Sequence, residues 1–375
     1  MNISEESTSN SLQQLAINLK DWGQNLGFQE LGIADTNLNI HKSHFLKWLG
    51  NHYHGEMQWM ANNISKRLQP QELVPQTIRV ISARMNYFPT ESKQIAILKS
   101  SHKAYISRYA LGRDYHKLIR KRLALLAEKI ADGFQQIQDR SEVIVQRPFV
   151  DSAPVLEKAF AEKAGLGWIG KNTLLLNQYA GSWFFLGEIY TNIPLPVDNK
   201  PQQNRCGDCS ACLKICPTDA FAGPYQLDAS RCISYLTIEL KGPIPEVFRE
   251  AIGNRVFGCD DCQIICPWNK FAQTSDESDF RPRHKLQDSN LVELFLWNEE
   301  EYLRYTLGSA IRRIGYERWL RNLAVGLGNA DPSPQIINAL KSRENFPSEL
   351  VREHIAWALK QQQKINYKRS RKIKR

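Results

Sequence analysis

Hydrophobic residues follow two different spacings along the first 200 positions of the chain. Residues 11–26 and 114–134 carry apolar side chains at helical intervals, and shorter helices are predicted over residues 44–60 and 154–167. Between them stand short runs rich in β-branched and aromatic residues, which predict strands over residues 28–35, 77–89, 104–112, 142–151 and 183–192. Strands that alternate with helices in this way predict an α/β domain over residues 1–200.

The pattern changes in the second half of the chain. Residues 201–275 hold clustered cysteines, and the polar residues 273–285 predict a linker. Residues 288–360 return to helical spacing and repeat it weakly, which predicts an all-α helical-repeat domain of the HEAT-like kind. Because two helical pairs are few for an independent solenoid, we expect them to pack against the neighbouring domain. Residues 361–375 form a basic tail.

The composition is that of a globular protein. Hydrophobic residues make up 42% of the 375 positions. The sequence contains no run of 18 apolar residues, so a membrane-spanning helix is not expected. Of the net charge of +10, eight lysines and arginines between Lys360 and Arg375 supply +8, so the rest of the chain carries about +2. Such a tail neutralises nucleic-acid phosphates, or it is a solvated arm without a partner. No secretory signal is recognisable, so we expect a cytoplasmic protein.

Eight cysteines between residues 206 and 266 carry the strongest chemical signal. In a cytoplasmic chain, clustered thiols bind metal or do redox chemistry. The first run reads C-x2-C-x2-C-x3-C-P, the bacterial ferredoxin pattern in which the fourth cysteine binds the other cluster, and the second run is one cysteine short of it. Four ligands per 4Fe-4S cluster use all eight thiols: Cys206, Cys209, Cys212 and Cys266 for one, and Cys216, Cys232, Cys259 and Cys262 for the other. A zinc ribbon, the alternative, uses two separated C-x2-C pairs.

Asp151 and a glycine-rich loop are further candidates for chemistry. Asp151 follows a predicted strand and precedes a predicted helix, where its carboxyl group serves as a general acid if burial raises its pKa. Alternatively, Asp151 or Ser152 caps the helix. Residues 165–170 spell G-x-G-x-x-G, but a helix precedes them and strand-like residues follow, which argues against a dinucleotide site. The loop continues with Lys171 and Asn172 and still allows close approach to a polar ligand.

Two further groups of polar residues carry weaker signals. Asp114 and His116 resemble the start of the cobalamin-ligating D-x-H-x-x-G motif, but Ile119 stands where the glycine is required. Four arginines within ten residues predict contacts with phosphate or nucleic acid, or else a solvated helix face. They are Arg312, Arg313, Arg318 and Arg321.

Segments along nearly the whole chain carry a resemblance to a known family: GEMQWM, RVISARMNYFP, SRYALGRDYHKL, VDSAPVLEKAFAEKAGLGWIGKNTLLLN, GSWFFLGEIY, both cysteine runs, RCISYLTIELKGPIP, RNLAVGLGN and VREHIAWAL. Together these segments resemble the epoxyqueuosine reductase family. It implies an oxidoreductase, related to reductive dehalogenases, that reduces epoxyqueuosine to queuosine at the wobble position of tRNA. It also implies a cobalamin-binding α/β domain, a ferredoxin-like insert with two 4Fe-4S clusters, and a helical domain that holds the tRNA. An unidentified reductant, such as a ferredoxin or flavodoxin, and a monomeric state are expected.

The resemblance also implies roles for single residues. Electrons pass from the two clusters to cobalamin, and Asp151 protonates the departing oxygen so that water leaves. Cofactor contacts are implied for Arg67, Asp114, Tyr115, His116, Asp151, Lys171, Asn172, Ser234, Tyr235 and Thr237. Contacts with tRNA are predicted for Arg312, Arg313 and Arg321. The resemblance implies the same two sets of cysteine ligands as the counting above.

Two other interpretations use the same motifs. A reductive dehalogenase acting on a small molecule shares the cofactors, but such enzymes usually carry a twin-arginine export signal and lack the terminal helices. A non-catalytic electron carrier tethered to nucleic acid leaves residues 1–200 without a role.

Overall fold

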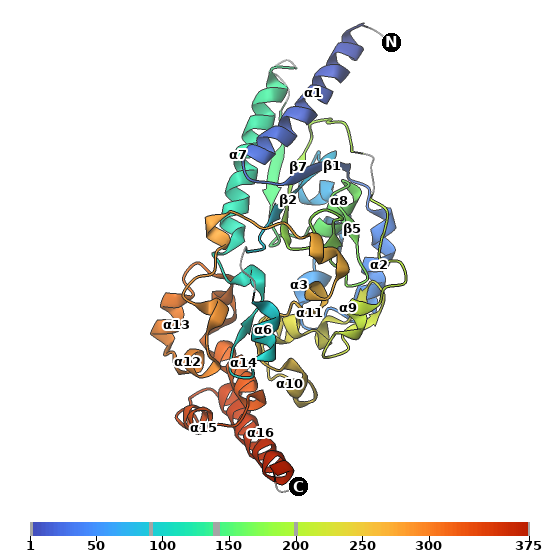
Figure 1. Cartoon of the computed structure of the whole chain (residues 1–375). Helices are drawn as coiled ribbons and strands as arrows, with labels where there is room; N and C mark the ends of the chain where they lie inside the picture. The colour runs from blue at the N-terminus through green and yellow to red at the C-terminus, as the bar shows by residue number, and fades with distance from the viewer. Residues whose placement is uncertain (1–2, 90–92, 138–142, 199–201, 374–375) are drawn as a thin grey trace.

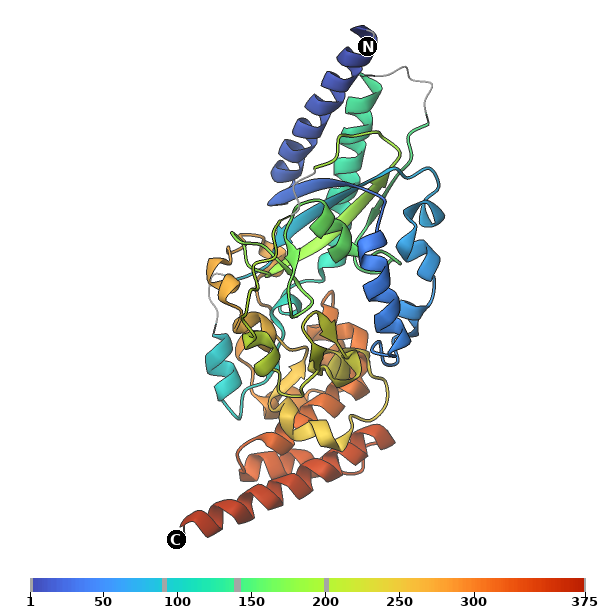
Figure 2. The ribbon, with the colours of Figure 1, turned by 90° about the vertical axis from the view of Figure 1, so that its right-hand side faces the viewer.

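The chain folds into an elongated molecule whose first and last helices lie at opposite ends (Figure 1). The structure is a computed structural model that describes residues 3–89, 93–137, 143–198 and 202–373. A sheet domain is followed by the cysteine-rich segment and then by the C-terminal helices, and a view turned by 90° shows the same order (Figure 2).

A four-stranded antiparallel sheet forms the centre of the N-terminal domain. Its strand order is β1 (Glu30–Asp35), β2 (Arg79–Asn86), β7 (Phe184–Thr191) and β4 (Gln146–Phe149), and each neighbouring pair runs antiparallel. The predicted alternation of strands and helices is present. Alternation along the chain does not fix strand direction, and here every neighbouring pair of strands is antiparallel.

Helices cover both faces of this sheet, which explains why β2 and β7 are buried along nearly their whole length. On one face, α1 (Ile3–Asn25) and α7 (Tyr115–Gln135) lie side by side (Figure 2). On the other lies α8 (Glu157–Lys163), which faces α2 (Asn39–Gly50) across a cavity. Of the apolar residues that predicted α7, Leu123, Leu126 and Ile130 are fully buried, and each contributes roughly 1.5–3 kcal/mol by leaving water. Leu118 is only partly buried, and its neighbour Ile119 is fully buried instead.

Several predicted elements are shorter or broken in the structure. The helix predicted over residues 44–60 ends with α2, and the chain turns before α3 (Gln58–Ala61), α4 (Ile64–Leu68) and α5 (Pro70–Leu73). His52 has a positive φ of 56°, which a continuous helix does not allow. The helix predicted over residues 154–167 is only α8. Part of the strand predicted over residues 142–151 lies outside the described residues, and β4 is its remainder.

The strand predicted over residues 104–112 is reduced to β3 (Tyr105–Ile106), which follows α6 (Gln94–Lys99). It pairs in parallel with β10 (Arg255–Phe257) of the cysteine-rich segment instead of joining the main sheet. A 3-10 turn, η1 (Arg108–Ala110), replaces the rest. The cause is the buried Asp260 carboxylate, which accepts hydrogen bonds from the Tyr105 hydroxyl (2.7 Å) and the Arg108 backbone N–H (2.9 Å).

The glycine-rich loop forms a hairpin of β5 (Trp168–Ile169) and β6 (Leu175–Leu176) after α8. Gly167 lies so close to the Leu176 carbonyl that a Cβ atom would be 2.2 Å from its oxygen. Gly167 therefore serves the geometry of the hairpin, which has a helix before it and strands in it, as the sequence indicates.

The cysteine-rich segment consists of short elements around the two cysteine runs. Each run forms one helical turn, α9 (Ala211–Lys214) and α11 (Asp261–Ile264), and these two turns contact each other. The others are β8 (Phe221–Gly223), β9 (Gln226–Leu227), η2 (Ala229–Arg231), η3 (Tyr235–Glu239), α10 (Glu246–Ile252), β10 and η4 (Pro267–Phe271).

The C-terminal helices share one hydrophobic core with the cysteine-rich segment. They are α12 (Leu291–Leu296), α13 (Glu299–Tyr305), η7 (Ala310–Ile314), α14 (Gly315–Asn329), α15 (Pro334–Lys341) and α16 (Glu349–Ile373). Helix α14 lies between α16 and β10, and Trp319, Leu323 and Val256 are fully buried there. The expected contact with the neighbouring domain is confirmed, whereas the HEAT-like repeat stays a prediction.

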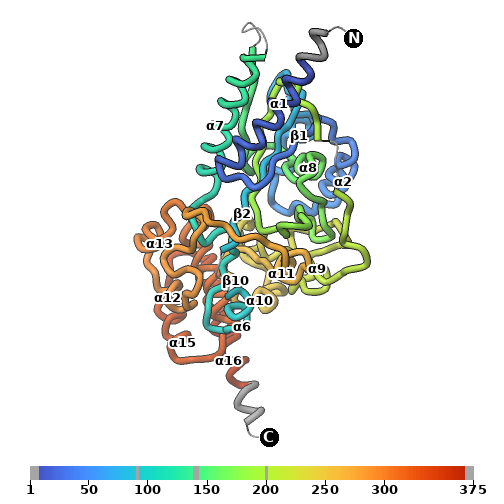
Figure 3. Tube along the Cα trace, turned by 45° about the horizontal axis from the view of Figure 1, so that its top comes forward, coloured from blue at the N-terminus to red at the C-terminus, as the bar shows by residue number. Residues whose placement is uncertain are grey.

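The predicted linker and tail are both part of the fold. Residues 273–285 include η5 (Ser278–Phe280), followed by η6 (Leu286–Asp288), and buried Phe280 contacts Phe185 of the sheet. The predicted basic tail continues α16, which ends at Ile373, while residues 374–375 lie outside the described residues. The tube in Figure 3 shows α16 at the end of the molecule opposite α1. Buried Gln362 bonds to the Leu327 carbonyl. In the part of the chain that the structure describes, no helix has the length and apolar character that a membrane span requires.

Candidate functional site

Asp151 lies in the turn between β4 and α8, with a left-handed backbone conformation (φ 53°). Neither Asp151 nor Ser152 caps α8, because the helix begins at Glu157, so the helix-cap alternative is wrong. The Asp151 carboxylate accepts a hydrogen bond from the Tyr115 hydroxyl (2.6 Å) and lies 3.5 Å from Nε2 of His116. Its backbone N–H donates to the Glu157 carboxylate (2.5 Å).

His116 links Asp151 to a second carboxylate. Its Nδ1 lies 2.6 Å from Asp114, which also caps α7 by accepting the His116 backbone N–H. Burial lowers the pKa of this imidazole, but the hydrogen bonds and charges of Asp114 and Asp151 outweigh burial and raise it to about 9. For Asp151, burial raises the pKa, but hydrogen bonds from His116 and Tyr115 hold it below its ordinary value. At neutral pH the proton therefore resides on His116 and Asp151 is ionised.

Asp151 borders two cavities. One, of about 530 Å³, extends from Asp151, Tyr115 and His116 to a group of four cysteines. The other, of about 860 Å³, lies between α2 and α8 and is lined largely by apolar and aromatic side chains, including Trp59. Ligand pockets are typically about 300–1,000 Å³, so the two cavities together leave room for a large cofactor beside Asp151.

Arg67 is buried at the edge of the larger cavity, and part of its guanidinium group is unpaired. One nitrogen donates to the Trp59 carbonyl (2.8 Å), whereas buried Nε has no partner among the described residues. An unsatisfied buried donor costs about 1–3 kcal/mol, which an acceptor on a bound cofactor relieves.

The eight cysteines, all of them described, gather in two groups of four free thiols. One cavity is lined by Cys206, Cys209, Cys212 and Cys266, and the cavity that reaches Asp151 is lined by Cys216, Cys232, Cys259 and Cys262. Burial raises the thiol pKa of Cys232, Cys259 and Cys262. Thiolates are stable this close together when a metal compensates their charge, so both groups fit iron–sulfur clusters.

Lys171 and Asn172 lie between the two cysteine groups. Lys171 donates to the Cys209 carbonyl (3.0 Å), and buried Asn172 donates to the Cys262 carbonyl (3.3 Å). Asn172 lines both cysteine cavities. The loop thus contacts the cluster segment, and Asn172 also faces the cavity beside Asp151.

The three residues predicted to connect cluster and cofactor have different environments. Ser234 and Tyr235 line the cavity, and Tyr235 accepts the Glu56 backbone N–H (2.8 Å). Thr237 is fully buried, and its hydroxyl donates to the Ile233 carbonyl (2.7 Å). The prediction that Thr237 contacts the cofactor is therefore wrong, because its position in the π-helical turn η3 directs it into the core.

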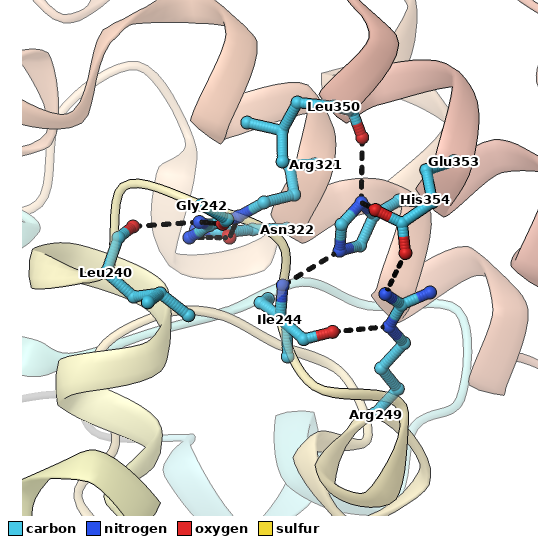
Figure 4. Close-up of polar contacts among 9 residues, drawn as sticks. All are labelled: Leu240, Gly242, Ile244, Arg249, Arg321, Asn322, Leu350, Glu353 and His354. Carbon is cyan, nitrogen blue, oxygen red and sulfur yellow. Dashed lines mark hydrogen bonds and ion pairs between the residues drawn. The ribbon is translucent and has the colours of Figure 1, made fainter.

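The arginines of the C-terminal helices also differ. Arg312 and Arg313 are exposed, and Arg313 pairs with Glu239 at the Asp151 cavity. Arg321 is fully buried and donates to the carbonyls of Leu240 (2.8 Å) and Gly242 (2.7 Å) (Figure 4). The prediction that Arg321 contacts tRNA is wrong, because its hydrogen bonds tie α14 to the cysteine-rich segment. Arg318, at the same helix, bonds to backbone carbonyls.

A second group in Figure 4 joins α16 to the cysteine-rich segment. Buried His354 accepts the Ile244 backbone N–H at Nε2 (3.1 Å), and its Nδ1 lies 2.7 Å from the Leu350 carbonyl. Arg249 donates to the Ile244 carbonyl (2.7 Å) and pairs with Glu353 (2.5 Å). Burial lowers the pKa of His354 to about 4, so a neutral imidazole holds this interface.

Sequence reasoning missed two carboxyl groups near Asp151. Glu157 contacts the Asp151 backbone, and Glu188 lies fully buried on β7. The sequence did contain a signal for Glu188, because it is a glutamate within the otherwise apolar strand FFLGEIYT. A charged residue buried in such a strand needs an explanation.

Two family models match the chain. One, described as "4Fe-4S double cluster binding domain", covers residues 205–269, and the other, described as "Epoxyqueuosine reductase QueG, DUF1730", covers residues 67–152. Together with the two thiol groups, the first defines an iron–sulfur protein that holds two 4Fe-4S clusters.

Relatives narrow this class to one family. Epoxyqueuosine reductase of Pseudomonas aeruginosa is 61% identical over 347 residues, which cover 92% of this chain and 94% of that protein. The Escherichia coli enzyme is 55% identical over 351 residues, covering 94% and 90%. The chain belongs to the epoxyqueuosine reductase family.

Two solved structures share the fold. A crystal structure of epoxyqueuosine reductase with an epoxyqueuosine-modified tRNA-Tyr stem loop has a TM-score of 0.84 and 28% identity, covering 94% of this chain and 91% of that one. The Bacillus subtilis enzyme, solved with its catalytic aspartate loop swung out of the active site, has a TM-score of 0.83 and 27% identity, with the same coverage.

Proposed function

We propose that the chain reduces epoxyqueuosine to queuosine in tRNA, a two-electron deoxygenation with loss of water. The observation that carries the proposal is one cavity that joins four cysteines to the Asp151–His116 pair. Two electrons delivered at one end, one proton delivered at the other and a second proton from solvent are what removal of an epoxide oxygen as water requires. Identity of 61% to a named epoxyqueuosine reductase supports this substrate.

The cysteines hold the two clusters in the sets formed by the cavities. Cys206, Cys209, Cys212 and Cys266 bind the outer cluster, and Cys216, Cys232, Cys259 and Cys262 bind the inner one. Cys209 is exposed, so the outer cluster is the one that receives electrons from a reductant such as a ferredoxin or flavodoxin.

The two cavities beside Asp151 hold cobalamin. Arg67, with its unpaired Nε, binds an acceptor group of the corrinoid, and Asn172, Ser234 and Tyr235 border the same space. When bound, cobalamin supplies the electrons from the clusters to the substrate.

The protein itself supplies the proton. His116 holds it at physiological pH because two carboxylates flank the imidazole. Asp151 lies at Nε2 of His116 and passes the proton to the departing oxygen, with the Tyr115 hydroxyl fixing the carboxylate. An acid is required because an alkoxide is a poor leaving group near neutral pH, and such catalysis typically contributes ~10²–10⁴-fold.

The C-terminal helices and the basic end of α16 bind the tRNA backbone. Arg312 and Arg313 are exposed and line a second cavity together with Asp114, and Arg313 also lines the Asp151 cavity, which supports this role. The enzyme acts as a cytoplasmic monomer, with a helical-repeat domain over residues 288–360.

The direct test is conversion of the modified base. Protein with anaerobically reconstituted clusters, added cobalamin and a chemical reductant is incubated with tRNA that carries epoxyqueuosine, and the nucleosides are separated by mass. We expect queuosine to form only when clusters and cobalamin are both bound. Unchanged epoxyqueuosine with fully loaded protein and bound tRNA contradicts the proposal.

A further inference from the structure

The carboxyl groups of two glutamates lie next to the turn between β4 and α8 that contains Asp151, called the Asp151 turn below. Glu157, at the start of α8, accepts the Asp151 backbone N–H at 2.5 Å. Glu188 lies on β7, is 0% exposed, and has no hydrogen-bond donor at either carboxyl oxygen among the described residues. Across the sheet Glu188 opposes Phe149, two residues before Asp151, and after burial the charge and hydrogen bond of the Glu157 carboxyl raise its pKa. A buried carboxylate that faces another carboxylate is unstable, unless a proton lies between them.

The nearby cations are engaged elsewhere. Lys158 donates to the Thr173 carbonyl (2.7 Å), and Arg67 to the Trp59 carbonyl (2.8 Å). Arg84, on the same face of the sheet, pairs with Glu30 (3.1 Å). His116 lies between Asp114 and Asp151.

The remaining neighbours of Glu188 are neutral or negatively charged. Ser82 of β2 stands directly opposite Glu188, and Phe149 of β4 opposes it from the other side. Tyr190 lies two residues along β7 on the same face. Asp151 adds a negative charge. Burial and Asp151 raise the pKa of Glu157 to about 7, and burial and Glu157 raise that of Glu188 further above its ordinary value.

We propose that Glu157 and Glu188 share one proton and act as positioning residues that hold the Asp151 turn in place. Glu188 donates the shared proton to Glu157, and Glu157 accepts the Asp151 N–H. That hydrogen bond offsets the left-handed backbone of Asp151, which a residue with a side chain adopts only rarely. This inference deepens the proposed function, because it rests on Asp151 as the proton donor.

The shared proton makes the turn sensitive to pH. When it is lost at alkaline pH, two adjacent buried carboxylates repel each other, and Glu157 turns away from Asp151. Glu188→Gln keeps a hydrogen-bond donor at the same position but removes the titration, so the turn in that variant stays closed.

The first test is infrared spectroscopy of the full chain with reconstituted clusters and without cobalamin, at pH 7. Compared with the wild type, Glu188→Gln should lose absorption from a protonated carboxyl group. Glu128→Gln, which removes an exposed carboxylate of α7, is the control and should lose carboxylate absorption. Loss of carboxylate absorption alone in Glu188→Gln overturns the shared proton.

The second test is hydrogen exchange of the Asp151 amide in the same cobalamin-free protein. Glu157→Ala should speed exchange in the peptide that spans residues 148–156 roughly tenfold, because one hydrogen bond is lost. Glu157→Gln, whose amide oxygen still accepts, should restore protection. After correction for intrinsic exchange, protection in the wild type should fall at alkaline pH, while Glu188→Gln keeps it.

Unchanged exchange in Glu157→Ala, or an identical pH dependence in wild type and Glu188→Gln, overturns the positioning role. Both tests are independent of turnover. If they succeed while Asp151→Asn remains fully active, the proton-sharing pair stands and the proposed role of Asp151 fails.

Discussion

Replacement of Asp114 by asparagine should lower the pKa of His116 and shift the alkaline limit of the reaction to lower pH. The His116 imidazole lies 2.6 Å from Asp114 and 3.5 Å from Asp151. These contacts raise its pKa from 6.5 to about 9, which corresponds to on the order of 3 kcal/mol in favour of the imidazolium. Because the Asp114 hydrogen bond is the shorter one, Asp114→Asn should remove more of this free energy than Asp151→Asn.

The assay is a nuclear magnetic resonance titration of histidine side chains, with His116→Gln to assign the signal. In the wild type we expect half-protonation of His116 near pH 9. Because the folded pKa exceeds the unfolded one, the charged contact stabilises the fold fully below about pH 6.5 and is lost as pH rises through about 9. A His116 that titrates near 6.5 in the wild type, or that ignores Asp114→Asn, refutes the reasoning.

Three further substitutions test other parts of the site. Asp151→Asn should retain tRNA binding and lose ~10²–10⁴-fold in single-turnover rate, and near-native turnover would remove Asp151 from the acid role. Arg312→Ala and Arg313→Ala should each weaken tRNA binding and reduce its salt slope by about 1, and an unchanged slope would exclude phosphate contacts there. Arg321→Ala should instead lower the free energy of unfolding by about 3 kcal/mol or more in a thermal melt, because it leaves buried carbonyls unpaired, and a lowered salt slope in this variant would contradict its buried role.

The cysteine pattern and the strong helices were predictable because their signals are local. A thiol spacing such as that of Cys206 to Cys216 is dictated by the geometry of a cluster, and α7 repeats its apolar residues over several turns. The two cavities contain the same four-and-four division that ligand counting predicts. The spacing of both runs, together with the count of all eight thiols, carries that information without knowledge of the rest of the fold.

The misplaced residues depend on tertiary contacts that local pattern does not contain. Arg312 and Arg321 belong to the same short arginine-rich segment, and local pattern does not distinguish them. Arg321 is a core residue because α14 is buried there, whereas Arg312 lies on the surface. Thr237 lies in the core, where its hydroxyl donates to the Ile233 carbonyl and accepts from the distant Gly258 N–H. The strand predicted around Tyr105 is short because the Arg108 backbone N–H donates to the distant carboxylate of Asp260 and not to a neighbouring strand. Strand direction in the sheet is likewise decided by the whole domain.

Iron and acid-labile sulfide analysis of anaerobically reconstituted protein tests the central claim most directly, since every electron in the account passes through the two thiol groups. Two 4Fe-4S clusters predict about eight irons and eight sulfides per chain, and Cys232→Ala, which removes a thiol only from the inner group, should lower both. Bound zinc, about half the predicted iron in the wild type, or an unchanged iron content in Cys232→Ala would contradict it.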